Sequence, residues 1–92
     1  MAERRVQYGV VDAVDADVAA GSPVFRATWQ SKDDLKEKMM SIDGVPKDCK
    51  LYLWKGQLWL RWEELDDLPG LEYDPLRIKV VRPQHAGEMV FY

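Results

Sequence analysis

The stretch LYLWKGQLWLRW, which runs from Leu51 to Trp62, decides the fold. On both sides of Lys55-Gly56 leucines alternate with aromatic and polar residues, and this period of two predicts a β-hairpin. A loop of two or four residues centred on Lys55-Gly56 sets the cross-strand pairs Leu53 with Leu58, Leu51 with Leu60, Cys49 with Trp62, Trp54 with Gln57, Tyr52 with Trp59 and Lys50 with Arg61. One face is then aliphatic, and we expect it to be buried, because register follows the pairing that keeps one face in the core.

The opposite face of the hairpin carries aromatic and basic side chains: Tyr52, Trp54, Trp59, Lys50 and Arg61. A second helix, a long loop or a chain terminus that covers this face is one explanation, because aromatic cross-strand pairs stabilise sheets. A partner-binding surface is the other, because a contiguous exposed patch of three large aromatics is unusual in a soluble monomer. The sequence leaves both explanations open.

The segments outside the hairpin add strands and one helix. Alternating residues predict a first strand over Arg5–Val14 and a second over Val24–Gln30, joined as an antiparallel pair. Ser31 is a good N-cap for a helix over about residues 32–42, whose apolar stripe is Leu35, Met39 and Ile42.

The second half of the chain predicts a short helical turn over Trp62–Leu68 and a strand over Leu76–Arg82. The apolar end, Met89–Tyr92, predicts a terminal strand or docked segment. We therefore expect an α+β fold: a mainly antiparallel sheet of five to six strands with one main helix packed on one face. Residues 1–92 should form a single compact domain.

Composition bounds the class of protein. The lone Cys49 forms no internal disulfide, and acids interrupt the N-terminal apolar stretch, so no signal peptide is expected. No run approaches the roughly 18 apolar residues of a membrane span. These features predict no membrane association and an intracellular, cytoplasmic protein.

Charge is unevenly distributed, although the net charge is only −3. The segment from residue 63 to 74 contains acids and no base: Glu63, Glu64, Asp66, Asp67, Glu72 and Asp74. The segment Arg77–Arg82 has three bases and no acid. This pattern predicts a bipolar surface and argues against nonspecific binding of duplex DNA.

The sequence gives little support for catalysis. His85 and Cys49 fall in no nucleophile motif, the ligands of a zinc site are absent, and the glycines form no phosphate-binding loop. The acids around Asp15 and Asp67 do not have the spacing of an EF-hand. We expect no enzyme activity, no catalytic residue, no metal site and no cofactor.

The favoured interpretation is a small non-enzymatic protein-binding module, an inhibitor or modulator that occludes a basic surface of its partner, such as a nucleic-acid channel. Small acidic domains of this kind are typical of phage- or mobile-element-encoded inhibitors, which act in the host cytoplasm. The six acids, together with the aromatic and basic face, are the candidate partner-binding residues.

Two alternatives belong to other classes. Single-stranded nucleic acid would stack its bases on the aromatic face, and its phosphates would meet the bases Lys50, Lys55, Arg61, Arg77 and Lys79. A structural or assembly subunit would pair through an exposed edge strand or through the tail Val90-Phe91-Tyr92. The sequence names neither the partner, nor the source, nor the oligomeric state.

Overall fold

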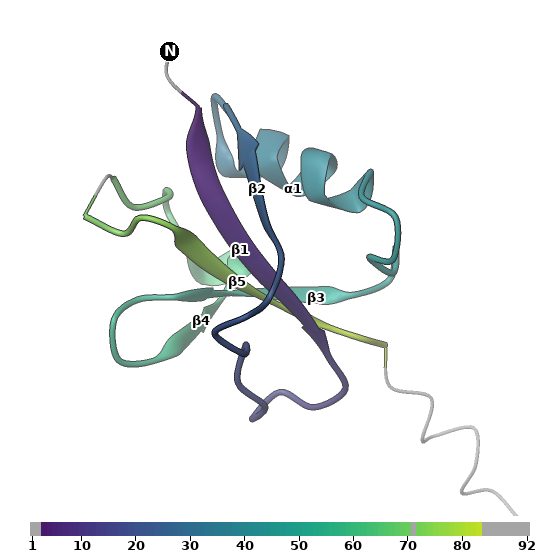
Figure 1. The fold of residues 1–92 in the computed structure, drawn as a ribbon. Coiled ribbons are helices and arrows are strands. Elements are labelled where there is room, and N and C mark those ends of the chain that lie inside the picture. The colour runs from purple at the N-terminus through teal and green to yellow at the C-terminus, as the bar shows by residue number, and fades with distance from the viewer. Residues whose placement is uncertain (1–2, 71, 84–92) are drawn as a thin grey trace, which may run out of the picture.

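The computed structural model describes residues 3–70 and 72–83, which contain a five-stranded sheet, an α-helix and a 3-10 turn. The strands lie side by side in the order β2-β1-β5-β3-β4, and α1 lies across one face of the sheet (Figure 1). In chain order the elements are β1 (Arg4–Val11), β2 (Val24–Ala27), α1 (Lys32–Met40), β3 (Lys50–Trp54), β4 (Trp59–Arg61), η1 (Trp62–Glu64) and β5 (Leu76–Val81).

The two central strands are parallel: β1 and β5 align Val6 with Leu76 and Val11 with Val81. The pairings of β1 with β2, β3 with β4 and β3 with β5 are antiparallel. The predicted α+β class is therefore confirmed, with a mixed sheet that is antiparallel except at its centre. Parallel partners need a long connection, and no local pattern reveals which distant strands will meet. The sixth strand expected at Met89–Tyr92 falls outside the described residues.

Five elements end earlier than their patterns predicted: β1 at Val11 rather than Val14, β2 at Ala27 rather than Gln30, α1 at Met40 rather than about residue 42, η1 at Glu64 rather than Leu68, and β5 at Val81 rather than Arg82. For β1 the cause is the series of aspartates that begins at Asp12, because Asp is disfavoured in strands. The predicted start of the helix is confirmed, since the Ser31 hydroxyl accepts a hydrogen bond from the Asp34 N–H at 3.2 Å.

The hydrophobic core lies between α1 and one face of the sheet. Leu35 and Met39 on the helix are fully buried against alternate residues of three strands, which are Val6, Leu51, Leu53, Leu76, Ile78 and Val80. The burial predicted for the leucine face of the hairpin is confirmed at Leu51 and Leu53. The opposite face of the sheet takes no part in this core.

The predicted hairpin register is wrong by two residues. The structure pairs Trp54 with Trp59 and Leu53 with Leu60, so the loop is 55–58 and Leu58 is exposed. The two faces survive because a shift of two keeps every side chain on its side of the sheet. A two-residue loop would favour positive φ at Lys55, whereas in the observed loop the residue with positive φ is Gly56, at +83°.

Candidate protein-binding surface

The connection between β1 and β2, residues 12–23, covers the face of the sheet opposite α1, and we call it the strap. Its Val18 is buried, with 3% of its surface exposed. The Gln7 side chain of β1 donates to the carbonyls of Ala20 and Ser22, at 2.9 and 3.3 Å. The strap is therefore held against the sheet by packing and by hydrogen bonds. The sequence predicts either one helical turn or a loop over Asp15–Gly21, and the signal for its covering role is an apolar Val18 among aspartates.

Two basic residues of β5 donate hydrogen bonds to the strap. Arg77 donates to the carbonyl of Val18 at 2.7 Å, and its guanidinium carbon lies 5.8 Å from the ring centres of both Trp54 and Trp59. The Lys79 ammonium donates to the carbonyl of Val14 at 2.5 Å and lies 4.6 Å from the ring centre of Trp59. Lys79 is 1% exposed, so both its charge and its stem lie inside the molecule.

The aromatic residues of the hairpin come together beside Arg77 and Lys79, the two bases that bind the strap. Tyr52 is buried, and Trp54 and Trp59 are half-buried, with ring centres 5.1 Å apart. Lys50 and Arg61 stay exposed at the margin of this cluster. The strap therefore binds the β1 and β5 part of this side of the sheet, whereas Trp54 and Trp59 remain partly exposed.

Burial and the negative charges nearby shift the pKa of Lys79 in opposite directions. Desolvation lowers its pKa from the ordinary value of 10.5, while the carboxylates of Asp17 and Asp15 on the strap raise it, and burial is the stronger cause. The unfolded chain therefore binds more protons at this position than the folded chain, in the interval between the lowered pKa and 10.5.

Because the unfolded chain binds more protons than the folded chain, the free energy of unfolding should rise with pH in that interval. The free energy of unfolding of the wild type, minus that of Lys79→Met, should stay flat near neutral pH and increase as the pH approaches 10.5. Urea denaturation followed by tryptophan fluorescence measures the free energy of unfolding of the wild type and of the variant. The exposed Lys47→Met is the matched control and should give a smaller slope. A difference that falls with pH would contradict the direction of the shift.

The six acids between residues 63 and 74 separate into two regions. Asp74 pairs with Arg5 of β1 at 3.2 Å, and Glu72 accepts the N–H of Gly70 at 3.2 Å. The other four, Glu63, Glu64, Asp66 and Asp67, lie in and after η1, and we call them the acidic surface. The sequence predicted one acidic run, whereas the fold keeps only four of its members together.

Within the acidic surface, two of the acids have partners. Glu64 accepts from Arg61 at 2.8 Å, a contact that raises the pKa of Arg61, and Asp67 accepts from the N–H of Leu68. Glu63 and Asp66 are exposed and make no hydrogen bond or ion pair with any described residue. These two carboxylates are the members most available to an external cation.

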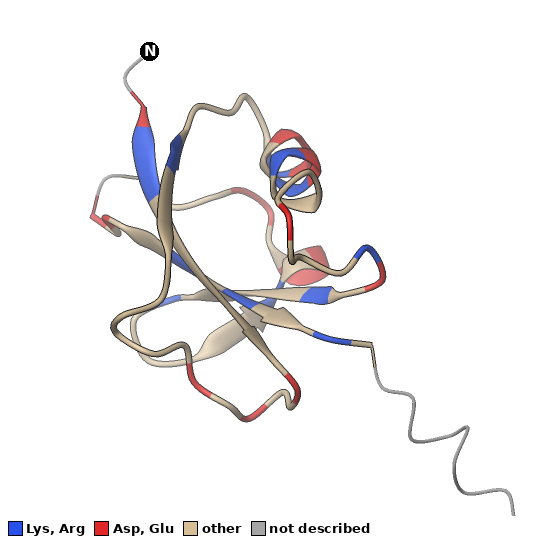
Figure 2. Ribbon diagram, turned by 45° about the vertical axis from the view of Figure 1, so that its right-hand side comes forward, with Lys and Arg blue, Asp and Glu red and all other residues tan. Residues whose placement is uncertain are grey.

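The beginning of α1 lies beside the acidic surface. Lys32, the first residue of the helix, donates to the carbonyls of Trp62 and Leu65 at 2.9 and 2.5 Å. Acidic and basic segments both occur along α1 in Figure 2. The first turn of the helix, which includes the exposed Asp33, therefore lies next to η1, and no local pattern in the sequence predicts this contact.

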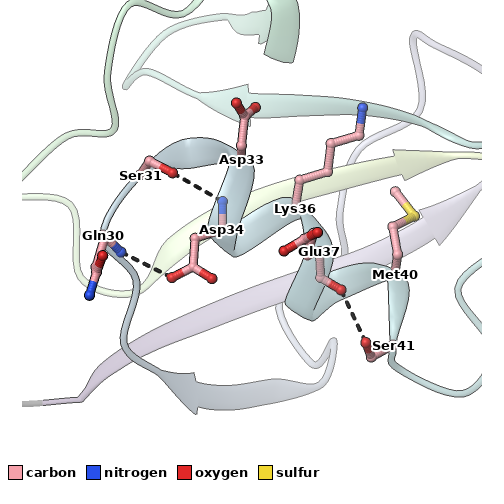
Figure 3. Close-up of a pocket in the computed structure, with 8 residues that line it drawn as sticks. All are labelled: Gln30, Ser31, Asp33, Asp34, Lys36, Glu37, Met40 and Ser41. Atoms are coloured by element: carbon pink, nitrogen blue, oxygen red, sulfur yellow. Dashed lines mark hydrogen bonds between the residues drawn. The ribbon is translucent and has the colours of Figure 1, made fainter.

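An open groove runs along the exposed side of α1 (Figure 3), lined by Gln30, Ser31, Asp33, Asp34, Lys36, Glu37, Met40 and Ser41. Its polar groups are largely engaged with each other. The Asp34 carboxylate accepts from the N–H of Gln30 at 3.1 Å, and the Ser41 hydroxyl donates to the carbonyl of Glu37 at 3.1 Å. The lining of the groove is net acidic, with Asp33, Asp34 and Glu37 against Lys36, whereas α1 as a whole carries three acids and three lysines.

Most of the lysines and arginines make hydrogen bonds or ion pairs with other residues of the chain. Eight of the 13 lysines and arginines place a charged nitrogen in an internal hydrogen bond or ion pair: Arg4, Arg5, Lys32, Lys38, Arg61, Arg77, Lys79 and Arg82. Five of these donate to main-chain carbonyls, which carry no neutralising charge: Arg4, Lys32, Lys38, Arg77 and Lys79. Of these eight, only Lys79 is buried, while Arg5, Lys38, Arg61 and Arg82 are exposed.

Within residues 3–70 and 72–83, no group of three or more His, Cys, Asp or Glu side chains is arranged to hold a metal ion. The Cys49 sulfur lies 4.0 Å from the Met40 sulfur, and burial raises the pKa of its thiol, which disfavours the reactive thiolate. His85 lies outside the described residues. In the same ranges no helix is long and apolar enough to cross a membrane.

We compared the chain with protein families, curated proteins and solved structures, and none of the three comparisons produced a match.

Proposed function

We propose that the protein is a small non-enzymatic protein-binding module, an inhibitor or modulator that occludes a basic surface of its partner through the acidic surface. The observation that carries the proposal is the contrast in how the two kinds of charge are used. Eight of the 13 lysines and arginines bind the protein's own carbonyls and carboxylates, while Glu63 and Asp66 stay exposed without such contacts to the described residues. The acidic surface therefore presents two carboxylates without an ion-pair partner among the described residues, and such groups attract a basic partner and speed its association.

The same contacts weigh against single-stranded nucleic acid as the ligand. Of the five bases assigned to phosphates, Arg77 and Lys79 donate to carbonyls of the strap and Arg61 pairs with Glu64, which leaves Lys50 and Lys55. Base stacking would need open ring faces on Tyr52, Trp54 and Trp59, whereas the guanidinium and ammonium groups lie against these rings. Nucleic acid would have to displace the strap before it could reach Arg77 and Lys79.

Charge reversal tests the proposal. We expect Glu63→Lys with Asp66→Lys to raise the dissociation constant of the complex by about tenfold at low salt and to flatten its dependence on salt. The matched control, Glu3→Lys with Asp48→Lys, changes the net charge equally at exposed positions outside residues 63–74 and should have a much smaller effect.

Partners are first captured from bacterial lysate on the immobilised wild-type chain, with and without nuclease treatment, and identified by mass spectrometry. Their affinity for each variant is then measured by surface plasmon resonance at low and high salt. A discrete protein that survives nuclease treatment and responds to the first variant supports the proposal. Bound material that nuclease removes, or equal responses to both variants, contradicts it.

A further inference from the structure

The edge of β1 is only half covered by β2. The register runs from Arg4 with Ala27 to Gln7 with Val24, and a last hydrogen bond joins the Tyr8 N–H to the Pro23 carbonyl at 3.1 Å. Beyond that bond β1 continues to Val11, whereas the chain before Pro23 belongs to the strap. The last part of β1 therefore forms a short stretch of sheet edge that β2 does not cover.

Three main-chain groups of β1 face this open edge. In an antiparallel pair Tyr8 and residue 23 would exchange two hydrogen bonds, but Pro23 has no N–H, so the Tyr8 carbonyl receives no bond from it. Main-chain groups alternate in direction along a strand. Val11 accepts from the Arg82 N–H on the β5 side, so the N–H and carbonyl of Val10 point to the other side, like those of Tyr8.

A cleft of about 410 Å³ adjoins this edge. Its apolar lining includes Tyr8, Val10 and Val18, and its acidic lining is Asp17 from the strap and Asp43 from the loop after α1. Both aspartates are exposed to solvent. The cleft thus combines unused main-chain groups, an apolar wall and two carboxylates contributed by separate loops.

We propose that this cleft binds an extended peptide segment that adds to the edge of β1 at Val10 and places a lysine or arginine beside Asp17 and Asp43. Strand addition obtains affinity from main-chain hydrogen bonds and specificity from alternate side chains. A second copy of the chain is a poorer occupant, because a symmetric contact would bring Asp17 and Asp43 close to the same carboxylates of the other copy. This site is separate from the acidic surface, so the inference goes beyond the proposed function.

The probe is an acetylated, amidated eight-residue peptide of alternating valine and lysine, added to the isotope-labelled full chain and followed by NMR. We expect amide shifts at Tyr8, Gly9 and Val10, and exchange of the Val10 amide hydrogen slowed by about tenfold or more at saturation. The same peptide N-methylated at every residue, and a valine–glutamate peptide, should leave these signals unchanged. The first lacks main-chain donors, and the second has the wrong charge.

Paired variants separate this site from the acidic surface. Asp17→Asn with Asp43→Asn should weaken binding of the lysine peptide by about three- to tenfold, whereas Glu63→Gln with Asp66→Asn removes the same charge and should not weaken it. Amide dispersion shows whether each variant is folded. Unchanged Val10 exchange, equal responses to the N-methylated peptide, or shifts that depend on protein concentration without peptide would each overturn the inference. None of these results bears on the acidic surface.

Discussion

Leu35→Ala is expected to lower the free energy of unfolding by about 3 kcal/mol, within the range of roughly 2–5 kcal/mol for Leu→Ala in protein cores. Leu35 is fully buried and lies with Met39 on the face of α1 that meets the sheet. A nine-residue helix does not form stably alone, so α1 depends on this contact. Small domains are stable by only about 5–15 kcal/mol, so the variant should approach the limit of folding.

Urea denaturation followed by far-ultraviolet circular dichroism measures this loss, and Leu58→Ala is the matched control. Leu58 lies in the hairpin loop and is 52% exposed, so we expect a change within about 0.5 kcal/mol. Equal losses for the two variants would mean that Leu35 does not join the helix to the core. A loss confined to Leu58→Ala would instead favour the hairpin register predicted from the sequence.

Arg77→Ala is expected to lower the free energy of unfolding by about 2–3 kcal/mol. A hydrogen bond from a charged donor contributes about 1.5–3 kcal/mol and a cation–π contact about 0.5–1 kcal/mol, and Arg77 makes one hydrogen bond to the strap and two such contacts with tryptophans. Because the Arg77 side chain is partly exposed to solvent, we expect a loss smaller than the sum of these three contributions.

Arg82→Ala is the control for Arg77→Ala. Arg82 pairs with Asp12 at 2.8 Å, but both side chains are mostly exposed, so the loss should be about 0–1 kcal/mol. Limited proteolysis adds a local measurement: Arg77→Ala should speed cleavage within residues 12–23, because the strap loses a contact at Val18. Unchanged cleavage there would show that Arg77 does not hold the strap.

These contacts explain how much of the candidate site could be predicted. The exposed carboxylates of Glu63 and Asp66 follow from composition, because a solvated acidic run needs no partner within the fold. The positions of Arg77 and Lys79 do not follow, since alternation along β5 places them on the face opposite the core but cannot say that a distant loop covers that face. The sequence therefore predicts which residues share this face, whereas the structure shows that Arg77 and Lys79 bind the strap.

The open edge at Val10 shows the same limit. Pro23 indicates a break in the chain from the sequence alone, and its missing N–H follows from its chemistry. That the missing donor falls opposite Tyr8, beside Asp17 and Asp43, depends on the register of β1 with β2 and on the course of two loops. Register and loop course are set by contacts between residues far apart in the chain.

The sequence by itself determined the elements and their faces. Alternating leucines at Leu51 and Leu53 marked the buried face of the hairpin, and Ser31 marked the start of the helix, because periodicity and capping are local properties. Only the tertiary structure decided the parallel pairing of β1 with β5, the hairpin register and the cover provided by the strap. These depend on which distant surfaces fit together, and a local pattern contains no information about its distant partner.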